Sequence, residues 1–176
     1  MKFAGIDASL TNTGIAVYDT TSEEYDIVSV SSSSSGNLLT ERGNRLEKIA
    51  NRVLDFIGTD VELVAIEGPA FSSNTGKVWD RAGLWWYIVK LLIRSGVEVI
   101  EIPPTTRAKY ATGKGNAGKD EVLLAVSRSY PDADIKNNDE ADAVIMCAIA
   151  ARLKDSPIED SLPKSKLDAM SKLTKD

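Results

Sequence analysis

The order of apolar segments along the chain is the feature that most restricts its fold. Short apolar runs of strand character occupy residues 3–7, 14–18 and 25–31. The first two are joined by residues 8–13, which are small and rich in hydroxyl groups, as a tight connection requires. Three strands joined so closely predict an antiparallel meander at the start of a sheet.

Helical and strand patterns alternate after the meander. Apolar residues recur at steps of three and four over 40–57, which predicts an amphipathic helix. We expect the remaining elements in this order: a strand over 61–66, a helix over 76–95, a strand over 97–102, two short helices around 113–118, and a last helix from Asn138.

An early meander followed by helix-linked strands predicts an α/β fold with a five-stranded mixed sheet flanked by helices. The strands over 3–7 and 61–66 are expected side by side and parallel near its centre. Residues 1–154 are expected to form this single domain. Residues 155–176 alternate charge with proline, which predicts a weakly ordered, charged C-terminal tail.

The composition removes several kinds of chemistry. The 176 residues include no His and one Cys, Cys147, which excludes a Ser-His-Asp triad, a His-containing zinc site and an intramolecular disulfide. Carboxylates, amines, hydroxyls and backbone remain. The formal net charge of −5 taken alone argues against a nucleic-acid partner. With no apolar run long enough to span a membrane and no targeting segment recognised, we expect a cytoplasmic protein without a membrane partner.

Four acidic residues occupy corresponding places on separate elements. Asp7 and Glu67 end apolar strands, and Asp139 and Asp142 lie three residues apart in the first turn of the last helix. Acids that end adjacent parallel strands meet at one edge of the sheet, where sites gather in such folds. Taken singly, each is better explained as a capping residue. Together they resemble the oxygen ligands of Mg²⁺ or Mn²⁺, and two such ions can drive phosphodiester hydrolysis.

Residues 103–119 form a basic segment without any acid. Its four cationic side chains are Arg107, Lys109, Lys114 and Lys119. Glycines among them allow close approach of a backbone to phosphate oxygens. The run from Gly113 to Lys119 also fits the GxxxxGK pattern of nucleotide-binding loops, but Asp120 stands where that motif needs Ser or Thr. Contact with phosphates and a plain solvated loop both remain open.

The expected helix over 76–95 is apolar on more than one face, whereas a surface helix shows a single apolar stripe. This helix is either packed deep in the core or uses its second face to form a homodimer. Lys77 and Arg81 are candidate contacts to a nucleic-acid backbone. Phe71, in the loop after Glu67, is either a core ring or a wedge against a base.

The order of these motifs resembles the RuvC family of Holliday-junction resolvases over about residues 3–153. The motifs that carry the resemblance are Gly5-Ile6-Asp7, Ile66-Glu67, the Pro-led basic segment with Lys109 and Lys119, and Asp139-Glu140-Ala141-Asp142-Ala143. The opening departs from the family's commoner Gly-Ile-Asp-Pro-Gly, since Ala8-Ser9 replaces Pro-Gly. This variant looks like a divergent, often phage-borne branch.

The resemblance implies an RNase H-like fold and a homodimer that cuts four-way DNA junctions by paired nicks. It implies two Mg²⁺ ions per site, with Mn²⁺ as a substitute, held by Asp7, Glu67, Asp139 and Asp142. Lys109 and Lys119 match basic residues that contact DNA or stabilise the transition state. The helix over 76–95 matches the family's dimer-forming helix, and Phe71 lies where members carry a residue near the junction.

Three other functions are compatible with parts of this pattern. One is an RNase H-like nuclease that cuts other branched, flap or single-stranded DNA. Another is an ATP-binding protein of the actin and sugar-kinase type, because the segment from Gly5 to Gly14 resembles that superfamily's first phosphate loop; the chain is short for the two domains this requires. The third is a non-catalytic junction-binding protein, in which four clustered acids would only weaken the binding of DNA.

Overall fold

The computed structural model describes residues 1–34, 36–69 and 77–173. Its centre is one sheet in the order β3-β2-β1-β4-β5. The strands are β1 Lys2–Asp7, β2 Asn12–Asp19, β3 Glu24–Ser31, β4 Leu63–Glu67 and β5 Val99–Ile102. The first three strands pair antiparallel, and β4 pairs parallel with both β1 and β5. The predicted mixed sheet is therefore confirmed, including the parallel contact at its centre.

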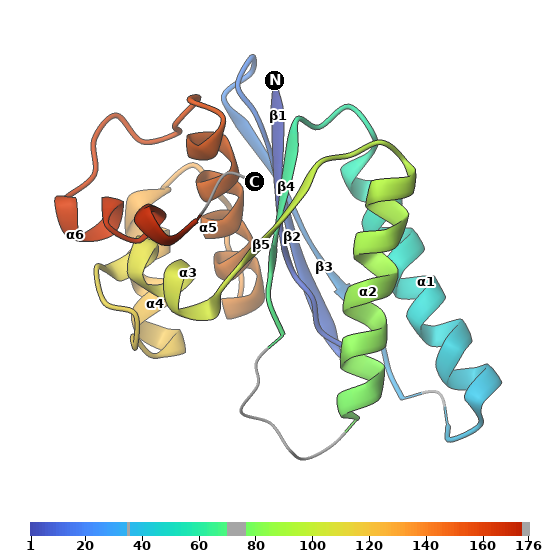
Figure 1. The fold of residues 1–176 in the computed structure, drawn as a ribbon. Coiled ribbons are helices and arrows are strands. Elements are labelled where there is room, and N and C mark those ends of the chain that lie inside the picture. The colour runs from blue at the N-terminus through green and yellow to red at the C-terminus, as the bar shows by residue number, and fades with distance from the viewer. Residues whose placement is uncertain (35, 70–76, 174–176) are drawn as a thin grey trace.

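Helices cover both faces of the sheet (Figure 1). On one face lie α1 Leu39–Ile57 and α2 Val78–Arg94, and on the other lie α3 Pro104–Thr112, α4 Lys119–Ser129 and α5 Asn138–Leu153. Helices α1 and α2 begin and end within about two residues of the boundaries that their sequence patterns predict, and α5 begins at the predicted Asn138. None of the helices in the described ranges has the length and apolar character to cross a membrane.

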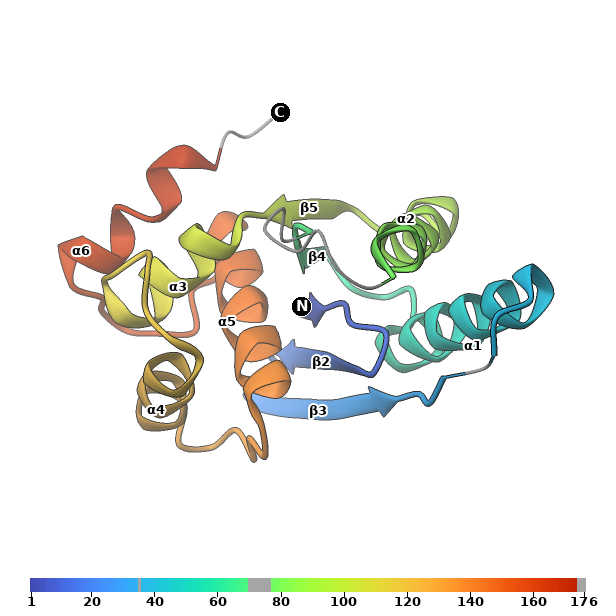
Figure 2. The same cartoon turned by 90° about the horizontal axis from the view of Figure 1, so that it is seen from below.

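Each face of the sheet has its own apolar core. Helix α1 buries Ile49, Ala50, Val53 and Ile57 against the sheet, as its periodicity predicts. Helix α5 is buried on all sides, because the sheet lies on one side of it and α3 and α4 lie on the other (Figure 2). Its residue Cys147 is completely buried, in agreement with its place in an apolar run.

Helix α2 has two apolar faces with different environments. Leu84, Ile88 and Leu92 are almost completely buried against the sheet and α1. Trp79, Trp86 and Ile93, spaced seven residues apart, are 84%, 64% and 59% exposed. The exposed side chains repeat with the period of a helix-pairing stripe, so a second apolar face of this helix has no cover in the single chain.

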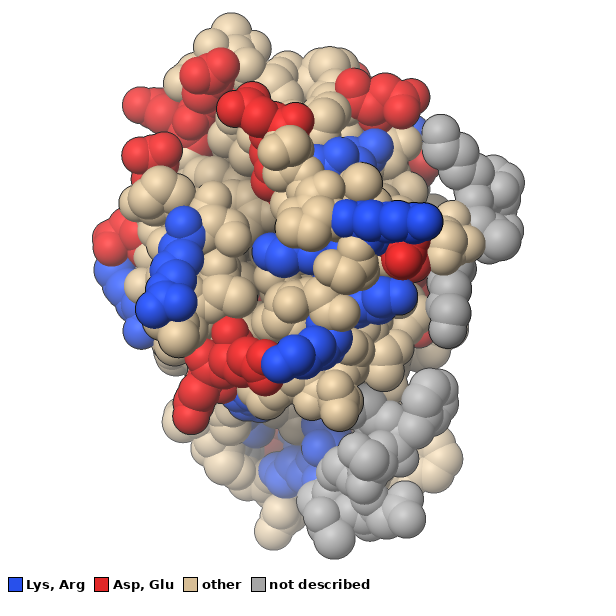
Figure 3. Space-filling view, turned by 90° about the vertical axis from the view of Figure 1, so that its left-hand side faces the viewer, with Lys and Arg blue, Asp and Glu red and all other residues tan. Residues whose placement is uncertain are grey.

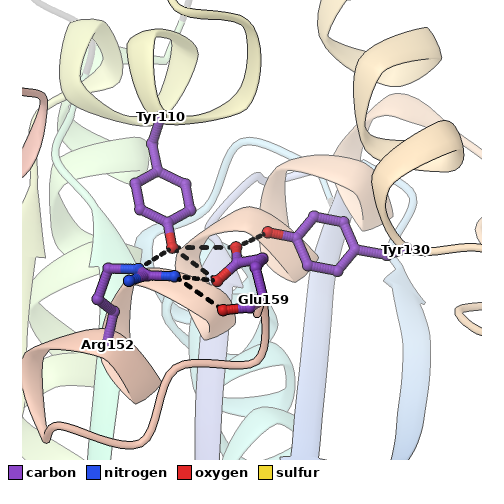
Figure 4. A network of polar contacts seen from close by, with 4 residues as sticks. All are labelled: Tyr110, Tyr130, Arg152 and Glu159. Carbon is purple, nitrogen blue, oxygen red and sulfur yellow. Dashed lines mark hydrogen bonds and ion pairs between the residues drawn. The ribbon is translucent and has the colours of Figure 1, made fainter. Parts of the chain in front are cut away.

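The segment after α5 is the one that the sequence predicts to be a weakly ordered, charged tail. It contains the short helix α6 Lys164–Leu167 and a 3₁₀ turn at Met170–Lys172, and Ala169 is 3% exposed. Glu159 anchors it: Arg152 Nη2 donates to Glu159 Oε2 over 2.8 Å, and the hydroxyls of Tyr110 and Tyr130 donate to the same carboxylate (Figure 4). A charged network of this kind has no local sequence pattern, so the sequence gives no signal for these contacts of Glu159. The division into domains stays a prediction.

Candidate active site

Asp7 and Glu67 lie at the same edge of the sheet. Asp7 ends β1 and Glu67 ends β4, and the two strands run parallel with Ile6 opposite Ile66. Figure 2 looks onto this edge, where α5 lies beside the strands. The indole Nε1 of Trp85 donates to the backbone oxygen of Glu67 over 2.9 Å, so α2 fixes the point where β4 ends. The predicted meeting of these two acids follows directly from the strand order.

Two glycines allow α5 to approach this edge. A Cβ atom at Gly5 would lie 2.0 Å from the carbonyl oxygen of Ala143, and one at Gly14 would lie 2.1 Å from that of Asp139. No side chain fits in either space, so the first turns of α5 rest directly on the backbone of β1 and β2. This close packing brings Asp139 and Asp142 to the strand ends that carry Asp7 and Glu67.

The start of α5 is held by polar side chains of the neighbouring strands. Asn12 Nδ2 donates to Asp139 Oδ2 over 2.6 Å, and Ser31 Oγ donates to Asn12 Oδ1 over 2.9 Å. Ser29 Oγ donates to the buried carboxylate of Glu140 over 2.7 Å. Sequence reasoning missed Asn12, because its partner is 127 residues away and the hydroxyl-rich connection around it carries no catalytic motif.

Arg107 lies between two of the four acids. Its Nε is 2.5 Å from Glu67 Oε2, and its Nη1 donates to Asp142 Oδ1. The side chains of Arg107, Glu67 and Asp142 are 12%, 14% and 6% exposed, so this is a buried triad. Arg107 comes from α3, within the basic segment, and the sequence predicted it as a DNA contact. The structure instead places it among the carboxylates.

The acids outnumber the cation that neutralises them, and their pKa values reflect this. Burial, followed by the negative charge of Glu67, Asp142 and Asp139, raises the pKa of Asp7 well above its usual range. Burial raises the pKa of Glu67 to about 7, against the opposing effect of Arg107. Burial also raises the pKa of Asp142, although Arg107 and Lys119 act in the other direction. The cluster is therefore short of positive charge.

The donor atoms of this cluster suit a hard divalent cation. Carboxylate oxygens are the ligands preferred by Mg²⁺ and Mn²⁺, and the buried Glu67 Oε2 has the ion pair with Arg107 but no well-aligned hydrogen bond from the described part of the chain. Within residues 1–34, 36–69 and 77–173, no three acidic groups are placed to hold one ion as they stand. The Arg107 guanidinium occupies the space between Glu67 and Asp142, so a metal ion shared by these two carboxylates requires that this side chain move aside.

The remaining predicted residues divide between the cluster and the surface. Lys119, the first residue of α4, is exposed but close enough to lower the pKa of Glu67 and Asp142. Lys114 is also exposed and pairs with Glu121 over 3.1 Å. Lys109 is partly buried on α3. On the face that carries α3, α4 and α6, Lys and Arg side chains gather across the middle (Figure 3).

Lys77 and Arg81 lie apart from that face, at the start of α2. They line a hollow together with Ser9 and Thr11, which follow Asp7 in the chain. Both residues are therefore near the carboxylate edge, as a DNA contact would require. Phe71 lies outside the described residues, so its predicted role stays a prediction.

Comparisons with known proteins agree with this geometry. The family model described as crossover junction endodeoxyribonuclease RuvC matches residues 3–151. The crossover junction endodeoxyribonuclease RuvC of Synechococcus sp. strain WH7803 is 33% identical over 152 residues, which are 82% of this chain and 94% of that protein.

Solved structures of lower identity share the fold. The RuvC structure of Thermus thermophilus is 21% identical and has a TM-score of 0.68, covering 89% of this chain and 98% of that one. RuvC of the same organism in complex with a Holliday junction substrate is 20% identical and has a TM-score of 0.67, covering 89% and 97%. By the family match and by its identity to a relative over most of its length, this chain belongs to the RuvC family.

Proposed function

We propose that this protein is a metal-dependent endonuclease that resolves four-way Holliday junctions. The single observation that carries the proposal is the buried excess of carboxylates at the carboxyl ends of β1 and β4, in a chain of the RuvC family. Nucleases of this family are metal-dependent in general. The relatives named above are crossover junction endodeoxyribonucleases, and one of the structures holds a Holliday junction.

The four acids have a common task in this mechanism. Asp7, Glu67, Asp139 and Asp142 would hold Mg²⁺, or Mn²⁺ in its place, and we propose two ions per site. When bound, such ions activate a water molecule and stabilise the leaving oxygen of a phosphodiester. Asn12 orients the Asp139 carboxylate through its hydrogen bond. Arg107 now pairs with Glu67 and Asp142, so its guanidinium would be available to a phosphate oxygen of the substrate if these two carboxylates held a cation.

Basic side chains near the acids would bind the phosphates of the substrate. Lys119 stands at the start of α4, close to Glu67 and Asp142, where its ammonium group can stabilise negative charge in the transition state. Lys109, Lys114, Lys77 and Arg81 would bind DNA farther from the scissile bond, and Phe71 is proposed to contact a base near the junction.

The exposed stripe of α2 fits a homodimer. Trp79, Trp86 and Ile93 follow one another at intervals of seven residues and form one apolar face of α2. Two copies of the helix can bury this face against each other. A dimer would present two carboxylate clusters to a four-way junction, as paired nicks require. This proposal also includes a cytoplasmic location, where DNA substrates are found.

Cleavage of defined DNA structures tests the proposal. The purified protein is given four-way, flap and linear DNA with Mg²⁺ or with EDTA, alongside the variants Glu67→Gln and Glu62→Gln. Glu62 is an exposed acid just before β4, so it is a matched control. We expect Mg²⁺-dependent nicking of the four-way junction, a loss of about 10³-fold in Glu67→Gln because several kcal/mol of transition-state stabilisation disappear, and no change in Glu62→Gln.

Binding is measured on the same DNA by fluorescence anisotropy in EDTA. Glu67→Gln removes a negative charge from the site, so we expect junction affinity equal to or higher than that of the wild-type chain. Undiminished nicking by Glu67→Gln would overturn the assignment of the acids. Preferential cleavage of flap or linear DNA by the wild-type protein would instead identify a related nuclease with a different substrate.

A further inference from the structure

A second basic surface lies along α1, on the opposite side of the sheet from the basic segment. A groove of about 730 Å³ runs between this helix and the residues that follow β3. One wall carries the hydroxyls of residues 31–33, and the other carries Asn44, Lys48, Asn51 and Arg52. Hydroxyl, amide, ammonium and guanidinium groups are the donors that bind phosphate oxygens in nucleic-acid interfaces. We call this hollow the α1 groove.

Arg45 forms the floor of the α1 groove and is a buried cation with neutral partners. It is 9% exposed. Its guanidinium donates to Ser32 Oγ over 2.8 Å, to the Ser32 carbonyl over 3.1 Å and to the Leu10 carbonyl. It forms no ion pair with a carboxylate in the described ranges: the nearby Asp80, whose pKa it helps to lower, is paired with Arg42 instead. A buried charge is normally compensated by an opposite one, so this floor attracts an anion.

Two exposed cations extend this positive floor along α1. Lys48 and Arg52 are one helical turn apart on the same face and are both exposed. Neither forms an ion pair with any residue in the described part of the chain. Glu41 is the single acid that lines the groove, and its Oε2 accepts a hydrogen bond from the Leu38 backbone N–H over 3.1 Å. The groove therefore carries a net positive charge.

The α1 groove connects to the candidate active site. Arg45 also lines the neighbouring hollow of about 390 Å³, together with Ser9, Thr11, Lys77 and Arg81. Ser9 and Thr11 belong to the connection that follows Asp7. Figure 2 shows the chain from β3 to α1 lying beside this same edge of the sheet. Basic side chains therefore extend from the start of α2, beside the connection that follows Asp7, to the outer side of α1.

We propose that the α1 groove binds the phosphodiester backbone of a DNA arm that leaves the active site. Lys48 and Arg52 contact the phosphates, Ser32 and Asn44 add neutral donors, and Arg45 supplies the positive floor. This inference rests on the proposed function, because the arm belongs to the DNA whose junction lies at the carboxylates. It adds a second binding surface to the basic segment, on the opposite face of the sheet.

Junction affinity as a function of salt tests the two exposed cations. The double variant Lys48→Gln/Arg52→Gln is compared with Arg128→Gln/Lys154→Gln, which loses the same charge at the end of α4 and of α5. We expect about a tenfold weaker affinity for a four-way junction in EDTA, and a salt dependence of log K reduced by about one per lost phosphate contact. The control should keep the wild-type affinity and slope.

Protection of a thiol from alkylation gives a second, independent readout. Cys147 is the single cysteine of the chain and is completely buried, so a cysteine introduced by Arg52→Cys is the accessible thiol. We expect saturating four-way junction DNA to slow maleimide labelling at position 52 by about tenfold or more, as binding there excludes the reagent. Labelling of Arg128→Cys, on the far side of the sheet, should keep its rate.

The outcomes separate this inference from the proposed function. If the wild-type protein cuts and binds junctions while the groove variant keeps its affinity and position 52 stays unprotected, the groove does not bind DNA and the proposed function stands. Weaker binding in both double variants to the same extent would show a general charge effect and would also overturn the inference. If the wild-type chain neither binds nor cuts junctions, the proposed function itself fails.

Discussion

Two groups of largely buried charged side chains in the described residues differ in their balance, one at the edge where β1 and β4 end and one beneath the segment that follows α5. In the second group, Glu159 is paired with Arg152 and accepts hydrogen bonds from two tyrosine hydroxyls. In the first, Arg107 is shared by Glu67 and Asp142, while the pKa of the partly buried Asp7 is raised by three neighbouring acids against the opposing charge of Arg107. In the group beneath the last segment, one carboxylate has three donor side chains, whereas at the edge of the sheet two carboxylates share one guanidinium.

This difference indicates which group is structural. A buried carboxylate with all of its donors present stabilises the chain and leaves no capacity for a ligand. A buried cluster with too little positive charge costs stability, and such a cost is typical of a site that completes itself with a bound cation. The two groups should therefore respond in opposite directions when an acid is neutralised.

Removal of the acid from the balanced group gives the largest expected loss of stability. Glu159→Ala leaves Arg152 and the hydroxyls of Tyr110 and Tyr130 without their acceptor in a buried place. We expect the free energy of unfolding to fall by about 3 kcal/mol, since breaking a buried pair strands the partner charge. Chemical denaturation monitored by circular dichroism measures it.

An exposed ion pair is the control for this loss. Glu98 accepts from Lys154 Nζ over 2.6 Å, but the glutamate side chain is 61% exposed. Glu98→Ala should therefore cost less than about 1 kcal/mol. Equal losses in the two variants would show that Glu159 is no better placed than a surface acid, and the contrast between the two buried groups would fail.

The pH dependence of stability should reveal the acidic group. Folding raises the pKa of Glu67 from 4.5 to about 7, so over this range the folded chain keeps a proton that the unfolded chain has lost. The free energy of unfolding in EDTA should therefore fall as the pH rises from 4.5 to about 7, by on the order of 2 kcal/mol. Urea denaturation at a series of pH values measures this slope.

Glu67→Gln provides the comparison for that slope. The variant has no proton to lose at this position, so its stability should change less over the same pH range. Acids whose pKa values are lowered by folding, such as Asp19 and Asp60, act below about pH 4 and leave the interval clear. A stability that is flat or rises with pH in the wild-type chain would contradict the charge imbalance at the carboxylate edge.

Local patterns in the sequence predicted most of the fold and the four acids. Strand and helix periodicity placed Asp7 and Glu67 at the ends of two strands, and the parallel pairing of β1 and β4 brings them to one edge. The net charge of −5 was a poor guide to partners, because many acids lie away from the basic surfaces. The distribution of charge along the chain carried the information.

Contacts between distant parts of the chain could not be predicted in the same way. Arg107 belongs to a basic segment, and only the packing of α3 beside α5 shows that it bridges Glu67 and Asp142. Asn12 reaches Asp139 from the start of β2, and Glu159 is held by residues from three helices or their ends. Such side chains depend on tertiary packing, for which neither periodicity nor composition gives a signal.

The smallest expected change in stability is that of Asp7→Asn, and its sign should be opposite to that of Glu159→Ala. Asp7→Asn removes a partly buried negative charge that Glu67, Asp142 and Asp139 repel, and it keeps the shape of the side chain. Near pH 8 in EDTA we expect the variant to be more stable than the wild-type chain by about 1 kcal/mol, whereas Glu159→Ala is less stable at the same pH. Thermal and urea unfolding measure both.

Excess Mg²⁺ should make the wild-type chain more stable than Asp7→Asn, which reverses the order expected in EDTA. The wild-type chain gains stability from the ion in proportion to RT ln(1 + [L]/Kd), and the variant, which lacks one ligand, gains less. At pH 4.5 the difference between them should also shrink, because the raised pKa of Asp7 favours its neutral form as the pH falls and the neutral form is not repelled. An Asp7→Asn variant that is destabilised in EDTA at both pH values would mean that Asp7 is a structural acid like Glu159. The excess of carboxylates would then not be evidence for a cation site.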